Sequence, residues 1–298
     1  MAKATAPANL AIRSRDFWIN RSDPLARWWL NSDPVATAFY NSLSVIFPKG
    51  EGYLIDSVHP FRHDMPPQLA ADILAYIRQE VIHTREHLAF NRHIVESGYD
   101  VSRLEKRICK ILALSADAPP FIRLAITVAL EHIVAIISHQ LIRNPAHLKG
   151  ADADIADLWR WHAAEEIEHK GVAYDAWMHA TRNWSGWRRW RIRSMVMLAT
   201  GWTFFSARRR DIAELLAQDG ISRRAATWKM ANFAVGKPGM ARNVAAAWLR
   251  YFQPGFHPWD RDDSDLIGLV DRHLVDGARG CARAAAREAS GRHSRRVR

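Results

Sequence analysis

Apolar residues recur three and four positions apart through most of the chain, which is the spacing of an α-helix. Alternating strand-like runs and hairpin dipeptides are scarce, so the pattern predicts an all-α fold. We expect the first helix to bend near "FPKGEG", where Pro48 and two glycines interrupt it, and residues 251–263 to form a loop. Helices are predicted at Pro34–Val58, Gln68–Glu96, Pro120–Ile142, Ala153–Arg182, Trp187–Gln218, 222–233, 239–252 and 263–276.

The segment "WHAAEEIEHKGVAYD", residues 161–175, places histidines and acids inside a helix that is otherwise apolar. With His162 as the origin and about 100° per residue, Glu166 lies about 40° to one side and His169 about 20° to the other. All three residues therefore share one narrow face. Buried charge is costly unless it is paired or bound to a metal, so this face is a candidate metal site.

The same residue types recur on other predicted helices. A single glutamate is followed on the next long helix by a Glu-x-x-His pair, and this order occurs twice along the chain. Separations of 29 and 35 residues between each lone glutamate and its pair suit two helical hairpins that bring both sets to one height. In a four-helix bundle this arrangement supplies inward-facing ligands for two metal ions about 3.5 to 4 Å apart. The six predicted ligands are Glu51, Glu80, His83, Glu131, Glu166 and His169.

Neighbouring residues leave alternatives open. Glu165 borders the same face as Glu166, but Glu166 repeats the spacing of the earlier pair and is preferred. Glu51 lies between two glycines that could place it on a loop. The residues expected to support the ligands through hydrogen bonds are His87, His132, His139 and Glu165.

The sequence "HTREH", residues 83–87, offers a different kind of metal site. In the arrangement H-x-x-E-H, His83 and His87 would bind one zinc ion and Glu86 would activate water, as in the inverted zinc peptidases. This alternative gives no role to the other inward-facing acids or to the second Glu-x-x-His pair. We therefore prefer the two-metal interpretation.

At the six predicted ligands, and over about Pro34 to Arg182, the chain resembles the ferritin-like di-iron carboxylate superfamily. This resemblance implies a ferritin-like four-helix bundle with additional C-terminal helices. His162 extends the second pair to H-x-x-x-E-x-x-H, which is similar to the arylamine N-oxygenases and implies that His162 is a seventh metal ligand. Over its whole length, including "FPKGEG" and "PGFHPWD", the chain looks most like a bacterial family known as predicted metal-dependent hydrolases.

The carboxylate-rich ligand set favours two iron ions, with manganese or zinc as alternatives. Our leading hypothesis from the sequence is a di-iron oxidoreductase that uses dioxygen and an electron donor to oxidise or N-oxygenate a small organic substrate. The alternative is a dinuclear metal-dependent hydrolase that attacks with a metal-bridging hydroxide. A metal-binding bundle without enzymatic activity is a third hypothesis.

The formal net charge of +11 is concentrated outside the predicted bundle, in "RRWRIR", "RRR" and residues 279–298, so nucleic-acid binding is not indicated. The two cysteines are too far apart in the sequence to suggest a disulfide framework or a cysteine metal site. We find no signal-peptide pattern and no uninterrupted apolar stretch that would span a membrane. A cytoplasmic location is therefore expected.

We divide the chain into an N-terminal extension (1–33), the metal-binding bundle (34–182), a C-terminal helical lid or docking region (183–277) and a basic tail (278–298). Within the third part, residues 186–210 combine tryptophans and arginines with an apolar centre. This profile is typical of a helix at a membrane surface, or of one that covers an apolar tunnel. An apolar substrate is compatible with it, and the oligomeric state stays open, a homodimer included.

Overall fold

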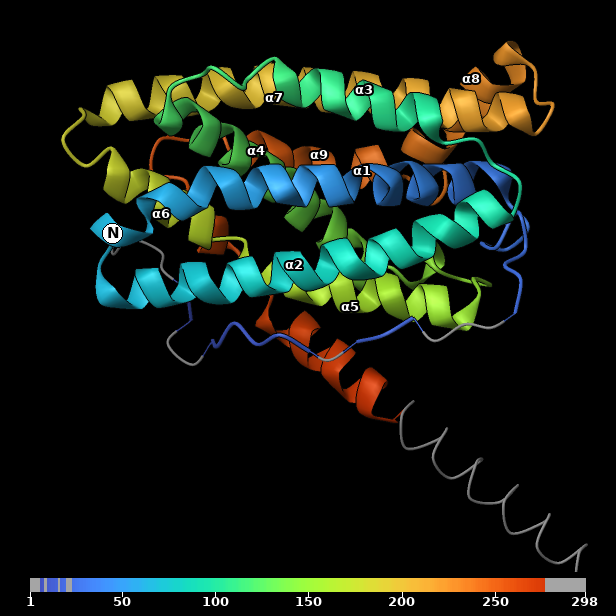
Figure 1. Cartoon of the computed structure of the whole chain (residues 1–298), viewed down its shortest axis with the longest axis horizontal. Coiled ribbons are helices and arrows are strands. Elements are labelled where there is room, and N and C mark those ends of the chain that lie inside the picture. Colours follow the sequence, from blue (N-terminus) through green and yellow to red (C-terminus); the bar gives the residue numbers. More distant parts are fainter. Residues whose placement is uncertain (1–5, 8–9, 16, 20–22, 277–298) are drawn as a thin grey trace, which may run out of the picture.

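The computed structural model describes residues 6–7, 10–15, 17–19 and 23–276, and helices dominate from residue 34 onward (Figure 1). The all-α prediction is confirmed within these residues, where the only extended pairing is a single bridge between Leu30 and Ala151. The predicted basic tail lies outside the described residues.

Four long helices form the bundle that carries the predicted ligands. The helices α1 and α2 pack along each other, as do α4 and α5, and a short connection joins the members of each pair in antiparallel directions (Figure 1). Contacts between α1 and α4 and between α2 and α5 close the bundle. The elements are α1 (Pro34–Val58), η1 (His59–Asp64), α2 (Pro67–Glu96), α4 (Pro120–Arg143), η2 (Pro145–His147) and α5 (Ala153–His169).

The helix α1 is a single helix through Pro48, where the sequence predicted a bend. A proline inside a helix leaves the carbonyl four residues earlier, here that of Ser44, without its usual N–H partner. The side chain of Asn91 on α2 donates a hydrogen bond to this carbonyl at 3.1 Å. Glu51 consequently lies on the helix, almost one turn after the proline, and not on a loop.

The fourth predicted helix, Ala153–Arg182, is in fact two helices, because α5 ends at His169 and α6 (Val172–Ala180) begins three residues later. A side chain at Gly171 in this break would lie 2.9 Å from the ring of Trp259, so the later loop packs directly against it. The single-helix prediction was wrong because a residue about ninety positions away in the sequence determines the break. The second Glu-x-x-His pair stays intact on α5.

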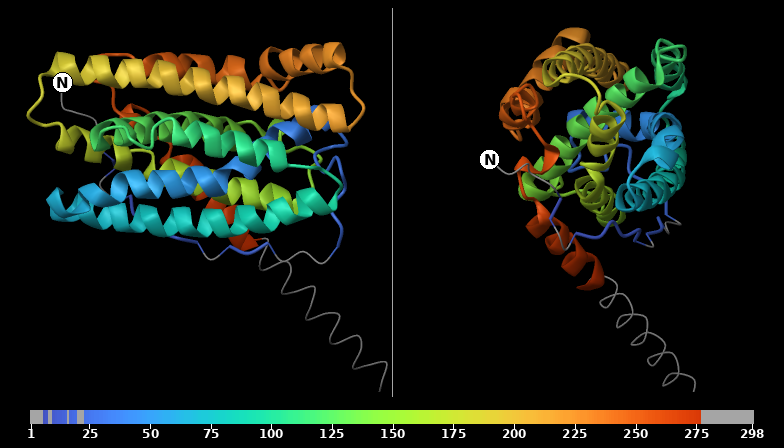
Figure 2. Two further views of the ribbon diagram at one scale, coloured as in Figure 1. Left: turned by 45° about the horizontal axis from the view of Figure 1, so that its top comes forward. Right: turned by 90° about the vertical axis from the view of Figure 1, so that its left-hand side faces the viewer.

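Further helices cover the bundle, and one of them, α3, was not predicted. The helix α7 packs against α1 and α4, and α9 packs against α4, so the bundle is covered on this side (Figure 2). Residues 264–276 are also helical. These covering elements are α3 (Ser102–Ala113), α7 (Gly186–Gln218), α8 (Arg223–Val235) and α9 (Met240–Arg250).

By length and composition alone, α4 could cross a membrane, and 67% of its most apolar 18-residue window is buried inside the protein. It packs against α1, α5, α6, α7 and α9. A helix that is apolar on nearly all sides is what the centre of a large helical protein requires. The composition of α4 is therefore explained by its place in the core.

The described residues between 10 and 19 follow an extended path along the outside of α2 and α5 (Figure 1). The backbone N–H of Arg15 donates to Glu165 on α5 at 2.7 Å, and that of Ile19 donates to Glu86 on α2 at 2.7 Å. We call residues 10–19 the N-terminal strap. It joins the two helices that carry the Glu-x-x-His pairs.

Candidate metal centre

The structure brings the seven predicted ligands into one region inside the bundle, and each is at most 3% exposed. Four helices contribute to it, since the glutamates and histidines face inward from α1, α2, α4 and α5. The residues that the structure assembles are Glu51, Glu80, His83, Glu131, His162, Glu166 and His169.

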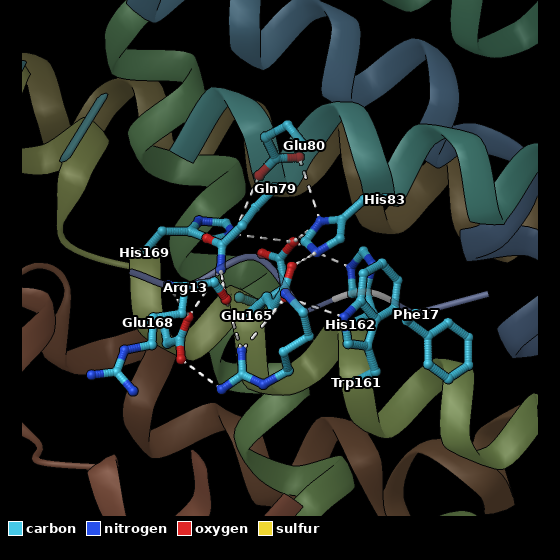
Figure 3. Close-up of polar contacts among 12 residues, drawn as sticks. Arg13, Phe17, Gln79, Glu80, His83, Trp161, His162, Glu165, Glu168 and His169 are labelled. Carbon is cyan, nitrogen blue, oxygen red and sulfur yellow. Dashed lines mark hydrogen bonds and ion pairs between the residues drawn. The ribbon is translucent and has the colours of Figure 1, made fainter. Parts of the chain in front are cut away.

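The two Glu-x-x-His pairs face each other across the bundle axis. One ligand atom from each of their four residues lies within 4.8 Å of the others. The Nδ1 atom of His83 is 3.5 Å from Oε1 of Glu166, and Nε2 of His169 is 3.3 Å from Oε1 of Glu80 (Figure 3). The spacing of three residues on α2 and α5 therefore produces the convergence that the sequence predicts.

A second group lies directly beside the first and consists of Glu51, His87 and His162, again with one ligand atom each within 4.8 Å of the others. The Nε2 atom of His162 is 3.2 Å from Oε1 of Glu166, so the two groups meet there. Nε2 of His87 forms a hydrogen bond with Nδ1 of His162 at 3.0 Å. His87 thus supports His162, as expected of a residue behind the ligands.

Glu131 lies at the edge of the first group. Its Oε2 atom is 3.1 Å from Nδ1 of His169, and its Oε1 atom accepts a hydrogen bond from the hydroxyl of Tyr76 at 2.8 Å. Glu131 therefore contacts His169 but is not one of the four residues whose ligand atoms lie within 4.8 Å of one another.

Several buried ligand atoms of the centre have no hydrogen-bond partner among the described residues. Such atoms are expensive to bury, because each has lost its hydrogen bonds with water and has gained none from the protein in return. Oxygen and imidazole nitrogen atoms in this proportion suit iron, manganese or zinc ions. The residues therefore fit bound metal ions. The atoms without partners are Oε1 of Glu51, both carboxylate oxygens of Glu80, Nδ1 of His83, Nε2 of His162 and Nε2 of His169.

Burial determines the protonation of the centre. Burial, reinforced by the charge of Glu80, raises the pKa of Glu51 well above its usual value. Burial also raises the pKa of Glu131 to about 7, although the nearby His169 opposes this shift. Burial alone would lower the pKa of His169, but the charges of Glu166 and Glu131 raise it to about 9. The centre thus holds protons at neutral pH, and binding of a cation would release them.

The adjacent acids Glu165 and Glu166 occupy different positions relative to the predicted ligands. Oε1 of Glu166 lies 3.5 Å from Nδ1 of His83 in the centre. Glu165 lies behind His83 and is 3.1 Å from its Nε2 atom (Figure 3). Glu165 also accepts hydrogen bonds from the indole of Trp161 at 3.1 Å and from the backbone of Arg15 at 2.7 Å. A carboxylate that holds Nε2–H in this way directs Nδ1 of the histidine toward a metal.

The structure does not bring every candidate to the centre. His132 and His139 lie on another face of α4, where His132 contacts the carbonyl of Ala247 at 3.3 Å and His139 contacts Asp263 at 3.0 Å. Glu86, the base of the zinc-peptidase alternative, accepts from the backbone of Ile19 and therefore faces the strap. That alternative would need Glu86 beside its two histidines.

Sequence reasoning missed the N-terminal strap as a part of the site. Arg15 pairs with Glu168 at 2.7 Å, and Phe17 stacks on Trp161 with ring centroids 5.0 Å apart (Figure 3). Many of its polar contacts use backbone groups, which any residue supplies, so the sequence carries no periodic signal for them. The available clue was that α5 carries two further acids, Glu165 and Glu168, beside the predicted ligand Glu166.

Comparison with known proteins gives one match. Residues 12–262 match the model of a family described as "Predicted metal-dependent hydrolase". None of the curated proteins and none of the solved structures that were compared matches the chain. The matched range includes most of the strap, the four bundle helices and the covering helices α7 to α9. Because it spans most of the sequence, the chain belongs to the family of predicted metal-dependent hydrolases.

Proposed function

We propose that the chain is a hydrolase whose centre holds two metal ions between α1, α2, α4 and α5. The observation that carries this proposal is the convergence of buried carboxylate and imidazole atoms that have no other partner. The description of the family supports the same reaction class. The residues that would hold the ions are Glu51, Glu80, His83, Glu131, His162, Glu166 and His169.

Metal ions bound there would polarise a carbonyl or phosphoryl oxygen and lower the pKa of a water molecule. The surrounding residues keep the ligands in position, since Glu165 fixes the ring of His83 and Tyr76 holds one oxygen of Glu131. The centre is buried, so bulk water is largely excluded and electrostatic interactions with a substrate are strengthened. An ester, amide or phosphoester is the substrate class on which such a site acts.

The dioxygen-dependent oxidation expected from the sequence is a second candidate function. One observation favours it, which is the position of His162. Its Nε2 atom lies 3.2 Å from Glu166 and has no hydrogen-bond partner, so the centre offers a seventh ligand atom. The resemblance to the arylamine N-oxygenases would require such a ligand.

The experiment that tests the proposal begins with metal-free protein, which is reconstituted separately with Zn²⁺, with Mn²⁺ and, without oxygen, with Fe²⁺. Metal content is measured per chain, and hydrolysis is followed with p-nitrophenyl esters and p-nitrophenyl phosphate. We expect two ions per chain and a hydrolytic rate that a chelator abolishes and added metal restores. Glu166→Gln should lose metal and activity.

Glu168→Gln is the matched control, because Glu168 is a buried acid on the same helix that faces Gln79 and the strap instead of the centre. It should keep both ions. Hydrolysis that is indifferent to chelation, or fewer than two ions per chain with every metal, would contradict the proposal. Turnover found only with Fe²⁺ and accompanied by uptake of dioxygen would support the second candidate instead.

A further inference from the structure

An apolar cavity with a volume of about 330 Å³ extends from the metal centre toward the outside of the bundle. It is lined by residues of α1, α3, α4 and α7, and its wall includes Phe47, Ile126, Leu130, Val196 and Phe204. Glu51 and Glu166 are its only acidic wall residues. The cavity is thus apolar along its length and reaches ligand side chains of the centre.

Apart from Thr200, the other polar side chains in the wall are engaged by the protein. The hydroxyl of Ser115 donates to Tyr53 and that of Thr203 donates to the carbonyl of Ala199. Arg208 donates to the carbonyl of Ser42 and forms an ion pair with Asp211. A ligand in this cavity would therefore find new polar partners mainly at the metal centre.

The outer part of the cavity is bordered by exposed side chains. Leu114, at the end of α3, is 82% exposed, and Ala199 on α7 is also exposed. Trp202, one turn further along α7, is 79% exposed beside this opening. The mouth is therefore surrounded by apolar surface, as a route for an apolar chain requires.

We propose that this cavity binds the apolar tail of a single-chain amphiphile and presents its hydrolysable head group to Glu51 and Glu166. This substrate class rests on the proposed hydrolytic function. With an acyl ester, the oxygen of water bonds to the acyl carbon, the carbon–oxygen bond to the alcohol breaks, and the alcohol leaves with one proton of that water. The acid product keeps the other proton of the water.

The volume of the cavity sets the length of the tail. A methylene group is similar in size to a water molecule, whose share of the liquid is about 30 Å³. A cavity of about 330 Å³ therefore accommodates a chain on the order of ten carbon atoms. The affinity of the protein for a straight-chain amphiphile should rise about fourfold for each methylene group added up to this length, and should then level off.

Gly50 and Gly52 provide a matched pair of positions for the test. Both flank Glu51 on α1, and a side chain at either position would meet no atom within 4 Å. Only Gly50 borders the cavity. Gly50→Leu should therefore fill the inner end of the cavity, whereas Gly52→Leu makes the same chemical change outside it.

Binding of 1-hexanol, 1-octanol, 1-decanol and 1-dodecanol to the full chain is measured by calorimetry, with and without metal. Alcohols are chosen because their head group carries no charge, so their affinity reports the contribution of the apolar tail. We expect Gly50→Leu to weaken binding of 1-decanol at least about tenfold. Gly52→Leu should bind it as the unmodified protein does.

A second pair of variants guards against misfolding at Gly50. Ala199→Trp narrows the exposed mouth and should also weaken binding, whereas Leu198→Trp, which changes an exposed neighbour outside the cavity, should not. Equal binding of 1-decanol by all four variants, or an affinity indifferent to chain length, would overturn this inference. If the protein binds 1-decanol but shows no metal-dependent hydrolysis of the p-nitrophenyl substrates, the proposed function is refuted. The assignment of the cavity as a site for an apolar tail would still hold.

Discussion

Two buried polar clusters lie along different faces of α4, and they differ in how their members are paired. One is the metal centre, to which α4 contributes Glu131. The other, which we call the lysine cluster, consists of His139, Lys170 and Asp263. Both contain acids and bases, and both are shielded from water. Composition alone therefore does not distinguish them.

In the lysine cluster each charged group faces a partner. Lys170 donates to Asp263 at 2.7 Å and to the carbonyl of Arg261 at 2.8 Å. The other oxygen of Asp263 is 3.0 Å from Nδ1 of His139, and the ammonium group of Lys170 also lies 4.0 Å from the centroid of the Trp259 ring. A satisfied network of this kind ties the loop at residues 258–263 to α4 and to the end of α5.

The metal centre has no such complete hydrogen-bond network. Several of its carboxylate and imidazole atoms have no hydrogen-bond partner, and these atoms lie close to one another. Removing a member should thus have opposite consequences at the two clusters. A loss at the metal centre should affect ion binding more than folding. A loss at the lysine cluster should affect folding more than ion binding.

The largest effect is expected for Glu80→Ala, since neither carboxylate oxygen of Glu80 has a hydrogen-bond partner and both lie near the histidines of the two pairs. We expect it to lower metal-dependent hydrolysis at least about a thousandfold, because metal ions supply several kcal/mol of transition-state stabilisation. Metal content per chain and hydrolytic rate are the measurements. The metal-free variant should unfold at no lower urea concentration than the metal-free unmodified protein, and a large loss of stability would remove the distinction between the clusters.

The second effect is on stability. Asp263→Ala leaves Lys170 buried without its partner, and breaking a buried ion pair costs about 3 to 5 kcal/mol of unfolding free energy. Urea unfolding of the metal-free protein measures this cost. Asp262→Ala, at the exposed neighbouring position, is the control and should cost only about 1 kcal/mol, because it removes the hydrogen bonds from Ser264 at the start of a helix but no buried ion pair. Loss of metal ions from a folded Asp263→Ala protein would contradict the separation of the two clusters.

A smaller effect is expected where a paired residue supports the metal centre. Glu165 is such a residue. It accepts hydrogen bonds from the strap and from Trp161, and it also contacts His83 of the metal centre. Replacing a carboxylate behind a metal-binding histidine weakens metal affinity about 10- to 100-fold. Glu165→Gln should therefore weaken binding of Zn²⁺ by this factor, as measured by competition with a chelating dye. Unchanged affinity would show that the orientation of His83 does not depend on Glu165.

The same contrast explains what could be predicted from the sequence. The helices of the bundle have a regular spacing of apolar residues, so α1, α2 and α4 begin and end within about one residue of the prediction. The repeated Glu-x-x-His spacing placed both pairs together because it depends only on the geometry of one helix. Information inside a single helix was therefore sufficient for the fold class and for the assembly of the candidate site.

Features that depend on residues far apart in the sequence could not be predicted. The break after His169 depends on Trp259, and the course of the strap depends on backbone groups. On α4, which is apolar on nearly all sides, the pattern has no distinct face, so the partners of the neighbours Glu131 and His132 could not be assigned. Only the packed structure shows that Glu131 contacts His169 in the metal centre and that His132 contacts the carbonyl of Ala247 instead.

The last predicted effects concern the pH dependence of stability, which should have opposite signs at the two clusters. Burial alone would raise the pKa of Asp263, but the hydrogen bond with His139 and the charge of Lys170 bring it below its usual value of 3.8. Its folded pKa is therefore below its unfolded pKa. The pairing of Asp263 stabilises the folded state fully above about pH 3.8. This stabilisation is lost as the pH falls through the lower pKa of Asp263 in the folded protein. The stability difference between the unmodified protein and Asp263→Asn should shrink in that window, by at most about 1.4 kcal/mol per pH unit.

Glu131 should show the reverse dependence in the metal-free protein. Its pKa is raised from 4.5 to about 7, mainly by burial, so the folded chain binds this proton more tightly than the unfolded chain does. Protonated Glu131 therefore adds to the free energy of unfolding fully below about pH 4.5, and this stabilisation is lost as the pH rises through about 7. Relative to Glu131→Gln, the unmodified protein should thus become less stable between these values, and urea unfolding at a series of pH values measures both windows. The same sign of pH dependence at Asp263 and Glu131 would show that the two sides of α4 are not electrostatically distinct.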